Sequence, residues 1–227
     1  MHGSLDSGWE CKPSPTGIVR YPTELQQSTE HPMDDSSMDP HVLLSDWLRT
    51  VFPAGPPLPV VVPTFLLPDQ EGWLISSDEM LARGPYVLSF FHGSWCPACL
   101  AKLGRLEAGL DRIHRHGADV VACSPETRGF PRTLKTGSAL RLNVLSDVDC
   151  ALSSDLGLAF VVPERIRARL EAMNIDLGER QGDGRWMLPI PVTIVVGRKG
   201  EVARIFATYG LDLDIEGIVA TVAGVQR

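Results

Sequence analysis

The stretch Trp95-Cys96-Pro97-Ala98-Cys99 decides the fold, because it joins a strand pattern to a helix pattern. The apolar run of residues 86–91 predicts a buried strand, and His92-Gly93-Ser94 after it predicts a turn. Beyond Cys99, apolar residues recur every three or four positions, which predicts one face of an amphipathic helix: Leu100, Leu103, Leu106, Leu110 and Ile113. A Cys-x-x-Cys pair at such a helix start is expected to form a reversible dithiol.

The helix-start position predicts a reactive thiol at Cys96. Unpaired backbone N–H groups and the positive end of the helix dipole favour a thiolate there, so we expect a lowered pKa and an accessible sulfur. Cys99 lies almost one turn later and is expected to be further inside, as the resolving thiol. Cys150 is the alternative resolving thiol, and Cys123, within an apolar run, is expected to be a core residue.

Three other interpretations of the cysteine pair fit the sequence less well. A zinc site needs four ligands, and the sequence shows one Cys-x-x-Cys with no matching Cys/His pair, so no metal is predicted. His114 and His116 are only two residues apart on a helix and point in different directions. An inert disulfide would close a very short loop, and two unreactive core cysteines fit the helix-start position poorly.

Composition restricts the function classes. The 227 residues are 44% hydrophobic and carry a net charge of −7 without a basic cluster, so nucleic acid and anionic membranes are not expected partners. No apolar stretch reaches membrane-spanning length, and the first ten residues show no secretory signal pattern. Because dithiols in reducing compartments are transient and catalytic, we expect a cytoplasmic protein.

The chain divides into a flexible N-terminal extension, residues 1–52, and a domain over residues 53–227. A short helix is expected around residues 42–48 within the extension. In the domain, the patterns predict a β-hairpin near residues 60–75, a second hairpin over residues 192–206 and a C-terminal helix. Between them we expect an irregular insert with short helices at residues 151–156 and 164–173 and a polar loop at residues 178–184.

This order predicts an α/β fold of the thioredoxin-like class. A βαβ unit followed by a ββα unit gives a central mixed sheet flanked by helices, with the dithiol at the start of the first helix. The N-terminal β-hairpin and the irregular insert are additions to that core.

An ordered series of motifs resembles the peroxiredoxin-like branch of the alkyl hydroperoxide reductase/thiol-specific antioxidant (AhpC/TSA) family, over about residues 58–206. The motifs are Val62-Pro63-Thr64-Phe65-Leu66-Leu67-Pro68-Asp69, residues 84–99, Ser124-Pro125-Glu126, Leu145-Ser146-Asp147 and residues 186–193. The resemblance implies a thiol-dependent antioxidant oxidoreductase that reduces hydroperoxides with Cys96 and Cys99. It implies no metal, flavin or nucleotide cofactor, an external thiol reductant such as a thioredoxin-type protein, and it allows a homodimer.

The chain departs from the family pattern at the reactive thiol. Where typical members place Pro, Thr and an activating Arg, this sequence has Ser89, Gly93 and Ile190. These departures keep two alternatives open: a thioredoxin-like thiol–disulfide oxidoreductase, and a redox-sensing binding protein without catalysis. The segment Ile190-Pro191-Val192-Thr193 resembles the cis-proline loop of thioredoxins, which implies a cis Pro191 facing the dithiol and an Ile190 carbonyl that pairs with substrate backbone.

Further residues around the dithiol are candidates for the site. Trp95, Pro97, Ile190 and Pro191 are expected to position substrate, with Trp95 shielding one side of the thiolate; core packing is the other explanation for Trp95. His92 and Lys102 are candidates for tuning the thiolate, His92 as a proton carrier and Lys102 through its charge. A hydrogen-bonded structural histidine and a solvated lysine are the alternatives.

Overall fold

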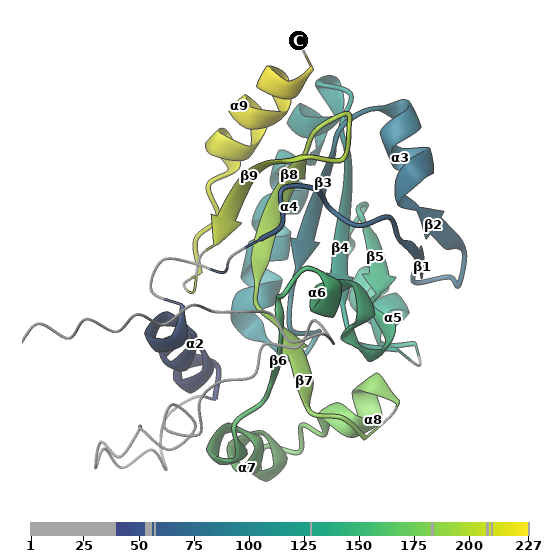
Figure 1. Cartoon of the computed structure of the whole chain (residues 1–227). Coiled ribbons are helices and arrows are strands. Elements are labelled where there is room, and N and C mark those ends of the chain that lie inside the picture. Colours follow the sequence, from purple (N-terminus) through teal and green to yellow (C-terminus); the bar gives the residue numbers. More distant parts are fainter. Residues whose placement is uncertain are drawn as a thin grey trace, which may run out of the picture.

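The computed structural model describes residues 40–52, 56, 58–127, 129–182, 184–207, 209 and 211–226. Its centre is a five-stranded mixed sheet with the strand order β5-β4-β3-β8-β9 (Figure 1). β3, β4 and β5 are parallel, whereas β8 pairs antiparallel with β3 and with β9. The strands are β3 (Tyr86–Phe90), β4 (Asp119–Ser124), β5 (Asn143–Ser146), β8 (Val192–Val196) and β9 (Val202–Ala207). The predicted βαβ and ββα units are therefore confirmed.

One face of the sheet is covered by α4 (Pro97–Arg115) and α9 (Ile215–Val225) (Figure 1). Successive strand residues point to opposite faces, so this layer receives Val87, Val120 and Val195 from the central strands. They pack with the apolar side of the two helices, Leu103, Leu106, Leu110, Ile113, Ile218 and Val222. All of these side chains are buried, which fixes the position of the start of α4 against the end of β3.

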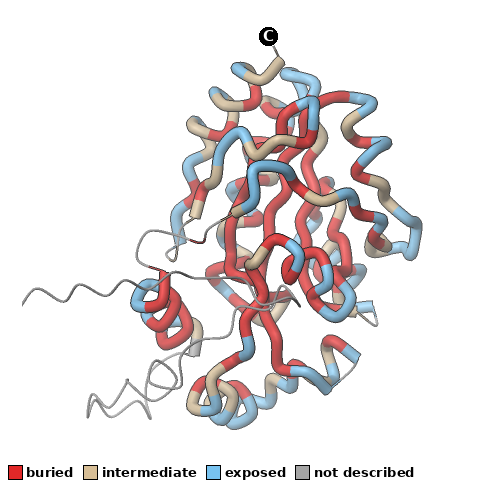
Figure 2. Tube along the Cα trace, viewed as in Figure 1, coloured by how far each residue is buried: buried red, intermediate tan, exposed pale blue. Residues whose placement is uncertain are grey.

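The opposite face carries the larger core. Leu88, Val121 and Ile194 point to this side of the sheet and pack with buried side chains of five helices. These helices are α2 (Pro40–Val51), α3 (Ser77–Arg83), α6 (Ala151–Asp155), α7 (Glu164–Ala172) and α8 (Leu177–Gln181). Figure 2 shows that the buried residues run through the centre of the molecule, while exposed residues lie on the outer helices and loops.

Two small antiparallel pairs flank the sheet. β1 (Leu66–Pro68) and β2 (Leu74–Ser76) form the predicted N-terminal hairpin. β6 (Ala159–Val161) pairs with β7 (Met187–Pro189), a pairing that the sequence pattern did not reveal. Two helices were also not predicted, α5 (Phe130–Gly137) and α8 (Leu177–Gln181), and the short 3-10 turn η2 (Val148–Cys150) precedes α6.

The polar loop expected at residues 178–184 is wrong for its first part, because α8 occupies it. Asp176 precedes this helix, and its side chain accepts a hydrogen bond from the Glu179 N–H at 3.1 Å. Capping of this kind stabilises a short helix whose side chains are mostly polar.

Helix α2 lies in the predicted N-terminal extension, yet its apolar side belongs to the core of the domain. Leu44, Trp47 and Leu48 are each no more than 3% exposed, and the Trp47 ring packs on Phe160 at 5.1 Å between centroids. Burying one such side chain contributes about 2 kcal/mol, so α2 is held as firmly as a core helix. The tail predicted before it lies outside the described residues. Among the helices described, each is too short or too polar to cross a membrane.

Candidate active site

The dithiol lies where β3 ends and α4 begins. Cys96 is the N-cap of α4, in an extended conformation with φ −97° and ψ 105°, and Pro97 occupies the first turn, where its missing N–H costs nothing. The Cys99 N–H donates a hydrogen bond to the Cys96 Sγ at 3.4 Å. The His92 N–H donates one to the Cys99 Sγ, also at 3.4 Å. Each sulfur therefore accepts a backbone N–H, which favours the thiolate form.

The sulfur of Cys96 is not accessible, and this part of the sequence prediction is wrong. Cys96 is 0% exposed and Cys99 is 2% exposed, and both are free thiols. Helix α2 is responsible, because its His41 places the ring Nδ1 3.5 Å from the Cys96 Sγ. The sequence indicated a helix at α2, but no local pattern could show that it covers a dithiol 55 residues further along the chain.

The pKa values of the two thiols are shifted in the opposite sense to the sequence prediction, which expected the lowered pKa at Cys96. The hydrogen bond to Cys99 and burial raise the pKa of the Cys96 thiol. Burial also opposes ionisation of Cys99, but the hydrogen bond from Cys96 and the nearby charge of His92 together lower its pKa well below the usual value. Within this hydrogen-bonded pair, ionisation is therefore favoured at Cys99 rather than at Cys96.

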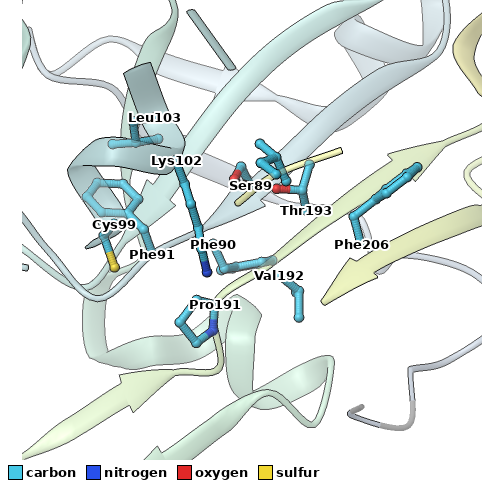
Figure 3. A pocket seen from close by; sticks show the side chains of 11 residues that line it. Ser89, Phe90, Phe91, Cys99, Lys102, Leu103, Pro191, Val192, Thr193 and Phe206 are labelled. Carbon is cyan, nitrogen blue, oxygen red and sulfur yellow. Dashed lines mark hydrogen bonds between the residues drawn. The ribbon is translucent and has the colours of Figure 1, made fainter. Parts of the chain in front are cut away.

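A narrow pocket opens beside Cys99 (Figure 3). Its lining includes Lys102, Pro191 and the hydrogen-bonded pair Ser89 and Thr193, whose hydroxyl oxygens are 2.8 Å apart. The space open to a water-sized molecule is about 10 Å³, enough for roughly one water molecule. This pocket brings Pro191 and Lys102 next to the dithiol, as the sequence predicted.

Lys102 is a partly buried neighbour of the two sulfurs rather than a solvated surface residue. Burial lowers the pKa of its amine, while the charge of the two cysteines acts in the opposite direction. In turn, the Lys102 charge favours the ionised form of Cys96. Figure 3 shows the amine directed toward Pro191.

The predicted cis peptide before Pro191 is wrong: the bond is trans, as are all described peptide bonds. The chain enters this position from β7, which is paired with β6, and the Ile190 N–H donates to the Leu158 carbonyl at 2.8 Å. An extended path from β7 into β8 suits a trans proline, whose missing N–H is tolerated at a strand start. Ile190 is fully buried, and its predicted role in holding substrate backbone stays a prediction.

His92 and Trp95 form one wall of the site. Their rings stack at 5.9 Å between centroids with an interplanar angle of 11°, and His92 also meets Phe160 edge-on at 6.4 Å. His92 is 1% exposed, whereas Pro97 is exposed at the start of α4. The roles of Trp95 and Pro97 in positioning substrate stay predictions.

A buried carboxylate that the sequence did not single out holds the turn before Cys96. Glu126 accepts hydrogen bonds from the Ser94 N–H at 2.6 Å and from the Ser94 hydroxyl at 2.9 Å. Its third partner is the Arg180 guanidinium of α8, at 2.8 Å. Glu126 belongs to a motif that carried the family resemblance, but only the fold shows that it fixes the turn at Ser94 and, through it, the position of Cys96.

Gly93 has no room for a side chain. Its φ is +148°, and an added Cβ would lie 2.7 Å from the Trp95 Nε1 and 2.8 Å from the Glu126 Cδ. The turn is therefore built for glycine, and a threonine here would require Trp95 or Glu126 to shift.

Gly93→Ala is expected to lower the free energy of unfolding by about 1–3 kcal/mol, because it forces this packed turn apart. Gly104→Ala is the matched control: Gly104 lies in α4 with nothing within 4 Å of an added Cβ. It should be neutral or stabilising by up to about 1 kcal/mol. Urea unfolding of the reduced proteins compares the two, and equal stabilities would show that the turn is not constrained as described.

Comparisons with known proteins agree with this geometry. The model of the AhpC/TSA family matches residues 60–205. Peroxidoxin BcpB from Mycobacterium tuberculosis aligns at a TM-score of 0.61 with 18% identity, covering 74% of this chain and 97% of the relative. Peroxiredoxin Q from Xanthomonas campestris aligns at 0.58 with 14% identity, covering 75% and 97%. The Xanthomonas campestris bacterioferritin comigratory protein aligns at 0.53 with 13% identity, covering 75% and 98%. No curated protein sequence matches significantly.

Proposed function

The chain belongs to the AhpC/TSA family, and we propose that it reduces hydroperoxides with Cys96 as the attacking thiol and Cys99 as the resolving thiol. As a member of this family it is a thiol-dependent oxidoreductase of the peroxiredoxin kind. The observation that carries the residue assignment is the meeting of two free cysteines at the start of α4, each accepting a backbone N–H. A structural relative, the Xanthomonas campestris bacterioferritin comigratory protein, has alkyl peroxide reduction activity, which supports a hydroperoxide as substrate.

In the proposed first step, Cys99 is the base that prepares Cys96 for attack. Because the two thiols are hydrogen-bonded, the Cys99 thiolate can take the Cys96 proton and leave the charge on the helix N-cap. The Cys96 thiolate then attacks the terminal peroxide oxygen and becomes a sulfenic acid, while the O–O bond breaks and an alkoxide leaves. The alkoxide takes the proton from Cys99 and leaves as an alcohol, which restores the Cys99 thiolate for the second step.

The second step closes the disulfide. The Cys99 thiolate attacks the Cys96 sulfenic acid, an S–S bond forms, and hydroxide leaves to become water. An external thiol must then reduce the Cys96–Cys99 disulfide by exchange, and we propose a thioredoxin-type protein for this step.

The narrow approach to the dithiol restricts the size of the substrate that can reach it. The pocket beside Cys99 has about 10 Å³ for solvent, so a molecule little larger than water can enter without movement. A bulky hydroperoxide or a protein disulfide requires α2 to move away from Cys96, because His41 occupies that approach.

We expect oxidation by hydrogen peroxide to be measurable but slow. Fast peroxide reduction needs donors aimed at the leaving oxygen, and the loss of one donor typically costs about a hundredfold or more. This chain has Gly93 and Ile190 where typical relatives have a threonine and an arginine. A thiolate alone does not polarise the O–O bond.

Stopped-flow oxidation of the reduced protein tests both the function and this rate. Hydrogen peroxide, cumene hydroperoxide and a small disulfide are compared, with thiol loss as the readout. A second-order rate with hydrogen peroxide near 10⁷ M⁻¹s⁻¹ would show that other groups, first Lys102 and His41, supply the missing polarisation. Oxidation by the disulfide alone would favour a thiol–disulfide oxidoreductase instead.

The same chemistry bears on the cellular compartment in which the protein works. We propose a reducing compartment such as the cytoplasm, because a disulfide that forms in each cycle must be reduced again. The homodimer allowed by the family resemblance stays a prediction that light scattering of the purified protein can test.

A further inference from the structure

The imidazole of His92 has no hydrogen-bond partner in the described part of the chain. The residue is only 1% exposed, and both ring nitrogens are buried without a hydrogen bond to the described residues. The ring cannot turn to find a partner, because Trp95 stacks on it and Phe160 meets it edge-on. The His92 side chain favours the ionised form of Cys99, so the imidazole and the dithiol form one buried group of possible ligand atoms.

The unpartnered imidazole lies beside both sulfurs of the dithiol. One ring nitrogen of His92 and the Sγ atoms of Cys96 and Cys99 all lie within 4.8 Å of one another. Bonds of about 2.3 Å to sulfur and 2.0 Å to nitrogen around a tetrahedral zinc ion place its ligand atoms roughly 3.5–3.8 Å apart. A small contraction of the cluster therefore brings three ligands to zinc-binding distance. The N–H groups that hydrogen-bond the two sulfurs would orient and stabilise them as metal-bound thiolates.

A candidate for the fourth ligand lies on α2. His41 places its Nδ1 3.5 Å from the Cys96 Sγ, but it lies outside the group of three whose ligand atoms are all within 4.8 Å of one another, so α2 must shift for His41 to bind the same ion. Two thiolates and two imidazoles are a tetrahedral donor set typical of zinc. The sequence predicted no metal because it shows no second Cys/His pair to match the Cys-x-x-Cys. In the fold, His92 and His41 both lie near the cysteine pair.

We propose that the reduced protein binds one Zn²⁺ through His92, Cys96 and Cys99, with His41 as the fourth ligand. This proposal rests on the proposed function, because the same two sulfurs serve both. When a peroxide oxidises the site, the two thiolates lose two electrons and form the S–S bond. The O–O bond breaks, its oxygens take two protons from solvent to give an alcohol and water, and Zn²⁺ leaves. The site thus binds zinc only while the dithiol is reduced.

Cobalt is the probe for this site, because Co²⁺ can replace Zn²⁺ in such sites and, unlike Zn²⁺, absorbs visible light. The full chain, reduced and freed of metal with a chelator, is titrated with Co²⁺. We expect one Co²⁺ per chain, a sulfur-to-cobalt charge-transfer band, the visible bands of a tetrahedral site, and displacement by Zn²⁺. The peroxide-oxidised protein should give no such bands.

Matched histidine variants assign the ligands. His92→Ala and His41→Ala should each weaken Co²⁺ binding tenfold or more. His114→Ala, an exposed histidine of α4, should leave binding unchanged. His41 is half-buried, so its variant tests the site even if His92→Ala fails to fold. Unchanged affinity in His41→Ala would remove this residue from the site.

Absence of the charge-transfer band, or an unchanged band and affinity in His92→Ala, would overturn the zinc site. Peroxide oxidation measured with the chelator present separates the two proposals. A chain that consumes peroxide but binds no Co²⁺ would lack the zinc site and keep the proposed function. A chain that binds Co²⁺ but is not oxidised by peroxide would contradict the proposed function.

Discussion

Replacement of Cys96 with serine is expected to lower the rate of peroxide reduction about a thousandfold or more, because the attacking sulfur is lost. Cys99→Ser should still react once, since Cys96 can attack, but it cannot close the disulfide. This variant should accumulate a Cys96 sulfenic acid, which a dimedone adduct at Cys96 would reveal by peptide mass spectrometry. Because Cys99 accepts the Cys96 proton in the proposed first step, the single reaction of Cys99→Ser should be slower than that of the intact pair.

Cys123→Ala is the control for this pair of variants. Cys123 is a fully buried thiol of β4 whose pKa is raised by burial, so it is not expected to react with peroxide. Its replacement by alanine should retain the peroxide rate. A sulfenic acid on Cys99 in the Cys96→Ser protein, together with full activity of that protein, would reverse the assigned roles.

Glu126→Gln is expected to lower the free energy of unfolding by about 3 kcal/mol. The change leaves Arg180, which is 21% exposed, without its charge partner and weakens the acceptor for Ser94. Removing one partner of a fully buried pair costs about 3–5 kcal/mol, and the partial exposure of Arg180 places this pair at the lower end. Since Glu126 holds the turn before Cys96, the variant should also react more slowly with peroxide.

An exposed ion pair provides the comparison for Glu126. Arg83 and Asp119 form a hydrogen-bonded pair at 2.6 Å with side chains 59% and 39% exposed. Asp119→Asn should cost less than about 1 kcal/mol, because water screens such a pair. Urea unfolding of both variants measures the difference. Equal losses would show that the Glu126 carboxylate does not organise the turn.

Local sequence patterns predicted the parts of the fold that depend on neighbouring residues. Around Cys96, a continuous apolar run gives way to apolar residues spaced three or four positions apart. This change in spacing predicted the strand–dithiol–helix unit, because residue spacing alone indicates which face is buried. The late hairpin was predicted for the same reason, since glycines flank its turn at Gly197 and Gly200. The place of Pro191 beside the dithiol was implied by the resemblance to the cis-proline loop of thioredoxins, and Pro191 and Cys99 do line one pocket.

Properties that depend on distant packing were not predictable in this way. The burial of Cys96 results from α2, whose position is set by Trp47 against Phe160 rather than by residues near the dithiol. The pKa of Cys99 is lowered by its hydrogen bond with Cys96 and by the proximity of His92, both of which require the folded geometry. The trans bond before Pro191 follows from the pairing of β7 with β6, which no local pattern indicated.

Peptide mass spectrometry of the reduced protein after one equivalent of hydrogen peroxide shows whether peroxide converts Cys96 and Cys99 to a disulfide. We expect that the chain loses the mass of two hydrogen atoms, that the peptides carrying Cys96 and Cys99 become linked, and that a thiol reductant reverses the change. Persistence of both free thiols while peroxide is consumed, or a disulfide between Cys123 and Cys150 in their place, would contradict it.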